Sequence, residues 1–158
     1  MSEIETLESM KAWEVVDQED DMNVIRSTWA FKLKRNPDGL IKKFKARFCA
    51  WGDMQLEGID FFETYAPVVQ WTTIRLMIIL EVLLGLKSKQ DDLTAAFLHA
   101  NLGKDKKVFI DMPRGFEVKG KNGKNKVLRL KKTLYGLRQS PRSFWKYMTS
   151  NMEFCLCL

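Results

Sequence analysis

The sequence predicts an α+β fold in which antiparallel hairpins pack with helices, and three observations lead to this class. Two stretches of alternating apolar and polar residues flank a turn at residues 36–39, which is typical of a β-hairpin. Stretches with helical patterns follow at residues 72–86 and from residue 140 onward. With 158 residues, 46% of them hydrophobic, the chain is long enough to bury the core of one domain.

The first 22 residues are acidic, with eight acids and Lys11 as their one base. Ile4, Leu7 and Met10 recur at a weak helical spacing, so we expect a short helix over residues 4–13 and then an acidic loop. The rest of the chain has 25 bases and 12 acids, a net charge of +13. Such a body favours a polyanionic partner, because neutralised phosphates release counterions. A merely soluble basic surface would give the same composition.

Residues 28–35 and 40–49 predict the two strands of the hairpin, each with an apolar and a cationic face. The connecting turn has Pro37 at its second position and Gly39 at its last, as a type I turn prefers. The cationic face is the best phosphate-contacting surface in the sequence, although strand lysines usually just face solvent. It consists of Lys32, Lys34, Lys43, Lys45 and Arg47.

The middle of the chain predicts a loop and then a helix. Residues 52–67 lack periodicity. Thr72 or Thr73 is expected to cap a helix that ends near residue 86, with Gly85 close to its C-terminal end. Because this helix is apolar almost all round, we expect it to be largely buried.

Further strands are expected at residues 90–98 and 107–112, separated by a turn. A second hairpin is expected between residues 116–118 and 126–130, because Asn122-Gly123 suits a tight turn.

The last predicted element is a helix with Ser140 as its cap and Pro141 in its first turn. Its mostly apolar face comprises Phe144, Tyr147, Met148, Asn151, Met152 and Cys155. Residues 154–158 are apolar without a closing turn, so we expect that the chain is cut short.

Composition argues against several classes of protein. No apolar run reaches the 18 or more residues that a membrane-spanning helix needs. The acidic N-terminus does not have the pattern of a signal or transit peptide. Three cysteines, including Cys155 and Cys157, suit neither a disulfide framework nor a metal site. We therefore expect an intracellular protein, in either the cytoplasm or the nucleus.

Two weaker signals are set aside. Gly115 and Gly120-Lys121 have the spacing of a phosphate-binding P-loop, but Asn122 stands where Ser or Thr is needed and no clean strand leads in. His99 is the only histidine, and no second ligand lies at a suitable spacing. We expect no P-loop here and a structural role for His99.

The adjacent carboxylates of Asp91 and Asp92 enter an apolar stretch, where a buried charge must be paired or must bind a cation. On a strand the two side chains point to opposite faces, so only one can enter a site. Alternatively, one of them caps a helix that begins at Leu93.

Asp92, followed after four residues by Phe97, resembles the first carboxylate motif of copia-type retrotransposon reverse transcriptases. The resemblance implies that Asp92 binds the catalytic Mg²⁺ ions and that the Leu93 carbonyl adds a ligand. It also implies that Phe97 packs under the nucleotide sugar and excludes a 2′-hydroxyl. The sequence departs from the family pattern at Asp91, Thr94 and Ala100.

Further motifs resemble the same family. Residues 42–52 match a segment in which Lys45 and Arg47 are implied to contact the triphosphate, although Trp51 replaces the last cation. Residues 134–142 match almost letter for letter, and by themselves they predict only a turn that leads into a helix. The resemblance implies that Gly136 and Arg138 lie against the template base and the incoming nucleotide.

The resemblance implies the fingers and the first part of the palm of a right-hand polymerase over residues 13–158, after an acidic segment at residues 1–22 with a short helix. It implies an RNA/DNA template-primer, deoxynucleotides and Mg²⁺ as partners, together with the rest of the polymerase if it is encoded elsewhere. The family's second carboxylate motif is not found after Pro141, so we expect an incomplete domain that is inactive by itself. Two alternatives stay open: a non-catalytic nucleic-acid-binding fragment, which would use the hairpin and the loop of residues 119–126, and an unrelated scaffolding α+β domain.

Overall fold

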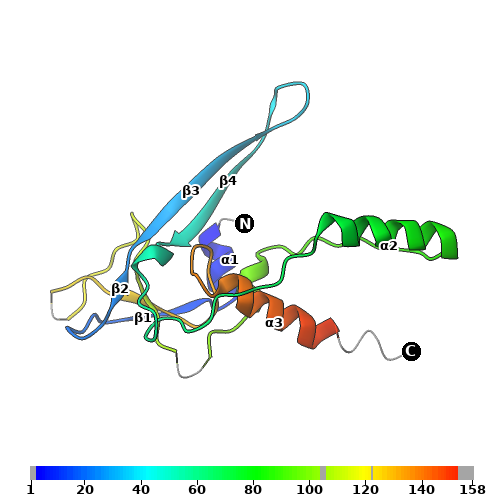
Figure 1. The fold of residues 1–158 in the computed structure, drawn as a ribbon. Coiled ribbons are helices and arrows are strands. Elements are labelled where there is room, and N and C mark those ends of the chain that lie inside the picture. The colour runs from blue at the N-terminus through cyan, green and yellow to red at the C-terminus, as the bar shows by residue number, and fades with distance from the viewer. Residues whose placement is uncertain (1–2, 104–105, 122, 153–158) are drawn as a thin grey trace.

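The structure, a computed structural model, describes residues 3–103, 106–121 and 123–152 (Figure 1). It agrees with the α+β class, since it has helices together with two sheets whose strands pair mostly antiparallel. The elements in order are α1 (Glu3–Ser9), β1 (Trp13–Val16), β2 (Val24–Ile25), β3 (Ser27–Arg35), β4 (Ile41–Ala50), the 3-10 helix η1 (Gly52–Met54), α2 (Trp71–Leu84), the 3-10 helix η2 (Ala96–His99), β5 (Phe109–Asp111), β6 (Val127–Leu130) and α3 (Ser140–Met152).

A four-stranded sheet with strand order β1-β6-β5-β2 organises the body of the molecule. β6 pairs antiparallel with both β1 and β5, whereas β2 pairs parallel with β5. The core forms where this sheet meets α1, the base of β4, η2 and the segment before α3. Its fully buried members include Leu7, Ile25, Phe48, Leu98, Val108, Ile110, Leu128 and Leu134.

The N-terminal prediction is correct in its helix but wrong in its extent. α1 ends at Ser9, and Lys11 takes the left-handed conformation with φ 52°. Trp13 then begins β1 opposite Leu130, where a helix end and an acidic loop were expected. A weak helical spacing could not compete with four consecutive residues that pair with β6.

The predicted hairpin is confirmed as β3 and β4, a two-stranded ribbon that rises away from the sheet (Figure 1). At the turn Gly39 has φ 84°, and the Asp38 carboxylate accepts a hydrogen bond from the Leu40 N–H at 3.0 Å. The apolar face is covered only at the base of the ribbon, where Phe48 is fully buried. Toward the tip, Phe31 and Phe44 are 77% and 75% exposed.

The expectation of a buried helix after residue 72 is wrong. α2 ends as predicted at Gly85, which is left-handed with φ 64°, but Gln70 is its N-cap and makes no side-chain capping bond. α2 has no buried residue and lies apart from the sheet (Figure 1). An apolar composition predicts a buried helix. In this structure no other described element packs over α2, so its apolar side chains stay exposed. In the described residues, no helix is both long and apolar enough to cross a membrane.

The expectation of a strand at residues 90–98 is also wrong, and so is the alternative of a helix that begins at Leu93. The chain is irregular there until Ala95, which has φ 53°, and then forms η2. The Leu98 N–H donates to the Ala95 carbonyl at 2.8 Å, and Leu98 is 2% exposed. The tight turn thus buries Leu98 without extending the backbone.

The remaining elements are confirmed in part. β5 lies within the expected strand, but β6 pairs with β1 and β5 and not with residues 116–118. The second hairpin is present as a short irregular one: the Lys126 N–H donates to the Val118 carbonyl at 2.7 Å, the Gly120 N–H donates to the Lys124 carbonyl at 2.8 Å, and Lys119 forms a bridge with Asn125.

α3 begins at Ser140 as predicted, but the Ser140 hydroxyl does not cap it. That hydroxyl donates to the Leu134 carbonyl at 2.5 Å, while the Gln139 carbonyl accepts the Ser143 N–H at 2.9 Å. The predictions for Cys155, for residues 154–158 and for the side chain of Met152 lie outside the described residues.

Candidate functional site

Asp92, the predicted metal ligand, lies on the exposed loop before η2. Its neighbour Asp91 pairs with Lys89 at 3.3 Å, and Leu93 is 42% exposed. No group of three or more metal-ligating side chains occurs in the described part of the chain. Mg²⁺ takes near-octahedral oxygen ligands, so one carboxylate and one carbonyl do not fit a pair of these ions.

Other predicted residues do come together, and they meet at Tyr135. The guanidinium carbon of Arg47 lies 5.0 Å from the centre of the Tyr135 ring. The Phe97 ring stands edge-on to the same ring, with centroids 5.0 Å apart. The other neighbour of Phe97 is Phe144 of α3, at 6.0 Å. Arg47, Phe97 and Tyr135 therefore form one cluster, which we call the Tyr135 cluster.

Arg47 is only partly satisfied in this cluster. Its Nε is buried and has no hydrogen-bond partner. A buried guanidinium N–H without an acceptor is costly.

Gly136 is required by close packing against the end of β4. The Ala50 N–H donates to the Tyr135 carbonyl at 2.8 Å, which draws the two backbones together. A Cβ on Gly136 would lie 2.0 Å from the Ala50 carbonyl oxygen, and one on Gly52 would lie 2.1 Å from the Gly136 oxygen. Gly136 also has φ 91°, which favours glycine.

Arg138 is an exposed residue that is nevertheless tied to the backbone of the preceding segments. Its Nε donates to the Gly52 carbonyl, and its backbone N–H donates to Gln55 Oε1, both at 2.8 Å. Its guanidinium carbon also lies 5.3 Å from the centre of the Phe61 ring. In this structure Arg138 therefore joins residues 134–142 to the segment after β4.

A buried polar network supports the same junction. The Gln55 amide donates to Gln139 Oε1 at 2.9 Å, and the Gln139 amide donates to the Asp60 carbonyl at 3.2 Å. The Asp60 carboxylate accepts from Asn23 Nδ2 at 2.7 Å and from the Leu56 N–H at 2.8 Å. Sequence reasoning missed this network. Residues 52–67 show no periodicity, and only tertiary contacts reveal that Gln55 and Asp60 are buried.

The cationic face of the hairpin is present and unneutralised. Across the ribbon Lys32 lies opposite Lys45, and Lys34 lies opposite Lys43. Like charges directly opposite each other repel, so an anion between them would be stabilising. No ion pair in the described part of the chain involves these four lysines.

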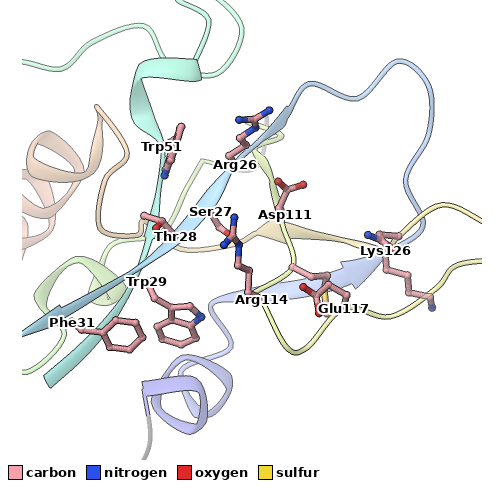
Figure 2. A pocket seen from close by; sticks show the side chains of 12 residues that line it. Arg26, Ser27, Thr28, Trp29, Phe31, Trp51, Asp111, Arg114, Glu117 and Lys126 are labelled. Atoms are coloured by element: carbon pink, nitrogen blue, oxygen red, sulfur yellow. The ribbon is translucent and has the colours of Figure 1, made fainter. Parts of the chain in front are cut away.

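A hollow of about 550 Å³ lies elsewhere, at the base of the hairpin (Figure 2). We call it the Trp51 hollow. Arg26 lies over Trp51, its guanidinium carbon 6.0 Å from the ring centre. Partial burial raises the pKa of the Asp111 carboxyl, and the charge of Arg26 opposes this rise. Lys126, from the loop expected to bind nucleic acid in one alternative, lines this hollow. The lining also includes side chains that the sequence did not mark as a site: Arg26, Trp29, Trp51 and Arg114.

His99 has structural surroundings. Its Nε2 lies 3.2 Å from the Thr94 carbonyl oxygen, and its ring lies 5.8 Å from that of Tyr147. These contacts join η2 to α3, in agreement with the structural role expected from the sequence.

Comparison with known proteins places this α+β fold in a family. A family model described as reverse transcriptase (RNA-dependent DNA polymerase) matches residues 10–154. The chain therefore belongs to the reverse transcriptase family.

Two of the three relatives described here are Pol polyproteins of transposons. The chain is 37% identical to the retrovirus-related Pol polyprotein from transposon TNT 1-94 of Nicotiana tabacum, over 96% of this chain and 11% of that protein. It is 34% identical to the corresponding polyprotein from transposon RE1 of Arabidopsis thaliana, over 91% of this chain and 10% of the relative. An uncharacterized mitochondrial protein of Arabidopsis thaliana is 39% identical over 68% of this chain and 62% of its own length.

The chain thus spans about a tenth of the length of these Pol polyproteins. No solved structure matches it. The matches confirm the copia-type resemblance drawn from the motifs at residues 92–97 and 134–142.

Proposed function

We propose that this chain forms the fingers and the first part of the palm of a copia-type reverse transcriptase, and that it helps to hold the template-primer and the incoming deoxynucleotide. The Tyr135 cluster carries the proposal. Arg47, Phe97 and Tyr135 belong to three motifs that are far apart in the sequence, yet their side chains meet. A shared site explains why all three motifs match one family.

Within this proposal Arg47 contacts phosphate. Arg47 is only partly buried and has no carboxylate partner in the described residues, so a phosphate would pair with its guanidinium with favourable charge. Lys32, Lys34, Lys43 and Lys45 continue the same cationic ribbon toward its tip. Phe97 and Gly136 shape the wall on which the sugar and base rest, while Arg138 holds that wall in position through Gly52.

The Trp51 hollow suits an unpaired base of the template. Single-stranded nucleic acid is bound by aromatic side chains on which bases stack and by cations that contact its phosphates. Trp51 is 41% exposed and lies beside Arg26, while Arg114 and Lys126 line other parts of the same hollow (Figure 2).

Asp92 is proposed to supply one carboxylate for nucleotide addition, with the Leu93 carbonyl beside it. The chemistry needs two metal ions, and the described residues do not provide enough ligands for both. Other carboxylates are therefore needed before the site is complete. The proposed domain begins near residue 13, and the pairing of β1 with β6 supports this boundary.

Binding tests the proposal directly. We expect the chain to bind a fluorescently labelled RNA/DNA hybrid with an affinity that falls steeply as salt is added. Lys32→Gln, Lys34→Gln and Lys43→Gln together should weaken binding at least tenfold at low salt, because about three phosphate contacts are lost. The matched control changes three exposed lysines outside the hairpin, Lys11, Lys87 and Lys107.

Equal losses in the two triple variants would contradict a specific role for the hairpin. The alternative function is nucleic-acid binding without catalysis. It predicts that Asp92→Ala leaves the affinity for nucleic acid unchanged, whether the chain is tested alone or with the rest of a polymerase. A scaffolding domain predicts no binding of nucleic acid or nucleotide at all.

A further inference from the structure

The acidic N-terminal segment pairs with one particular group of cations. Lys124 pairs with Asp20, and Lys126 lies 4.0 Å from Asp17. Along β6, Arg129 and Lys131 both pair with Glu14, at 3.1 and 2.8 Å. We call the cationic side of this region, formed by Lys124, Lys126, Arg129 and Lys131, the β6 cationic surface.

Strand pairing explains how the acids reach these cations. β1 runs antiparallel to β6, with Glu14 opposite Arg129 and Val16 opposite Val127. The chain beyond Val16 therefore continues beside the loop that leads into β6. The pKa of Glu14 is lowered chiefly by its hydrogen bond with Lys131, and that of Asp20 by its hydrogen bond with Lys124. Both carboxylates are thus charged at neutral pH.

The two cationic surfaces of the molecule differ in this respect. The hairpin lysines have no carboxylate partner in the described residues, whereas every member of the β6 cationic surface has one. Lys126 also lines the Trp51 hollow, so Asp17, which lies 4.0 Å from Lys126, is at the edge of that hollow.

The pairs beyond β1 can be broken easily. The side chain of Asp20 is 94% exposed and that of Asp17 is 44% exposed. Exposed ion pairs contribute little to stability, whereas a polyanion that takes their place also gains the release of its own counterions. Glu14 is different, because it is part of β1 and is held by two cations.

We propose that the segment of residues 17–20 is an internal competitor for nucleic acid: Asp17 and Asp20 occupy Lys126 and Lys124, and a single strand that enters the Trp51 hollow must displace them. This inference rests on the proposed function, since it concerns how the same chain binds nucleic acid. The acids lower the affinity for any strand too short or too weakly bound to displace them.

Removing the two acids tests the proposal. Asp17→Asn with Asp20→Asn is expected to tighten the binding of single-stranded oligouridylate, because two phosphate contacts become available. Each contact on a single strand steepens the salt dependence by about 0.7, so the log–log slope should steepen by about 1.4. The gain in affinity should then be about sevenfold larger at 50 mM than at 200 mM salt.

A matched control separates local competition from net charge. Glu8→Gln with Glu57→Gln makes the same change in charge at two exposed acids that pair with no cation in the described residues. It should change the affinity for oligouridylate much less. A gain equal to that of the Asp17 and Asp20 variant would overturn the proposal.

Removing the cations supplies the second test. Lys124→Gln with Lys126→Gln should weaken binding in the natural chain, and should weaken it more in the Asp17→Asn and Asp20→Asn background, where it cancels the gain. Equal effects in both backgrounds would overturn the proposal.

The triple variant of Lys32, Lys34 and Lys43 distinguishes a failure of internal competition from a failure of the proposed function. If the natural chain binds oligouridylate through the hairpin lysines but the acid variant gains nothing, internal competition is wrong and the proposed function stands. If no variant binds, both are wrong.

Discussion

Phe48 anchors the base of the hairpin. Its ring is fully buried, with centroids 5.8 Å from Trp13 and 5.3 Å from Trp29. Phe44 lies on the same face of the same strand but is 75% exposed. The alternating pattern predicted one apolar face for both residues, because a period of two identifies a face and not how far the core extends along it.

Replacing these two phenylalanines should therefore have unequal effects. Phe48→Ala is expected to lower the free energy of unfolding by about 3–5 kcal/mol, because it leaves a cavity in the core. Phe44→Ala should change it by no more than about 0.5 kcal/mol. Urea unfolding followed by tryptophan fluorescence measures both values. Similar losses would mean that the tip of the hairpin is also packed.

Gly39 and Gly136 have similar positive φ angles but different surroundings, so their substitutions can be compared. Gly39→Ala places a Cβ in open space at φ 84°, so only left-handed strain of about 1–2 kcal/mol is expected. Gly136→Ala at φ 91° adds a clash with the Ala50 carbonyl, so its loss of stability should be clearly larger. Thermal unfolding compares the two variants. A smaller loss at Gly136 would contradict the close approach of residues 134–142 to β4.

At the scale of elements, the loop that carries Asp92 differs most from the expectation. The residues before Leu98 were expected to alternate along a strand, but Ala95 turns left-handed and η2 follows. Alternation over a few residues cannot distinguish a strand from a loop with one buried anchor. Local pattern therefore located the motif but not its conformation.

For helix α2 the opposite holds: the sequence predicted its bounds almost correctly, but it wrongly predicted that the helix is buried. Met77 and Leu83 are 65% and 73% exposed. Met77→Gln with Leu83→Gln should change the free energy of unfolding by no more than about 0.5 kcal/mol per site and should reduce the binding of a hydrophobic dye. Leu130→Ala, at a buried position in β6, is the contrasting variant and should cost about 2–5 kcal/mol. A comparable loss from the α2 variant would mean that α2 is packed after all.

At the scale of the whole molecule, three distant motifs meet because β4, η2 and the segment before α3 share one core. Ala50 binds the Tyr135 carbonyl, and Leu98 and Leu134 are buried in the same cluster. The hairpin and the Trp51 hollow extend from this junction (Figures 1 and 2). The binding of a primed template and the extension of its primer can therefore be measured in separate assays.

We expect the 158-residue chain to bind a primed template without extending the primer, because one exposed carboxylate cannot hold two metal ions. A primer-extension assay with Mg²⁺ and deoxynucleotides measures this, with Asp92→Ala as the control. Extension by the natural chain above the level of that control would contradict the expectation and would show that Asp92 completes a site.

The sequence by itself determined the α+β class, the hairpin, the start of α3 and the reverse transcriptase family, since each depends on a local pattern or on a motif of contiguous residues. Only the tertiary structure decided that Trp13 begins a strand, that α2 is exposed, that Arg138 donates to the Gly52 carbonyl and that Gln55 and Asp60 are buried. The physical reason is that partners distant in the sequence decide burial and strand pairing, and a local pattern does not contain them.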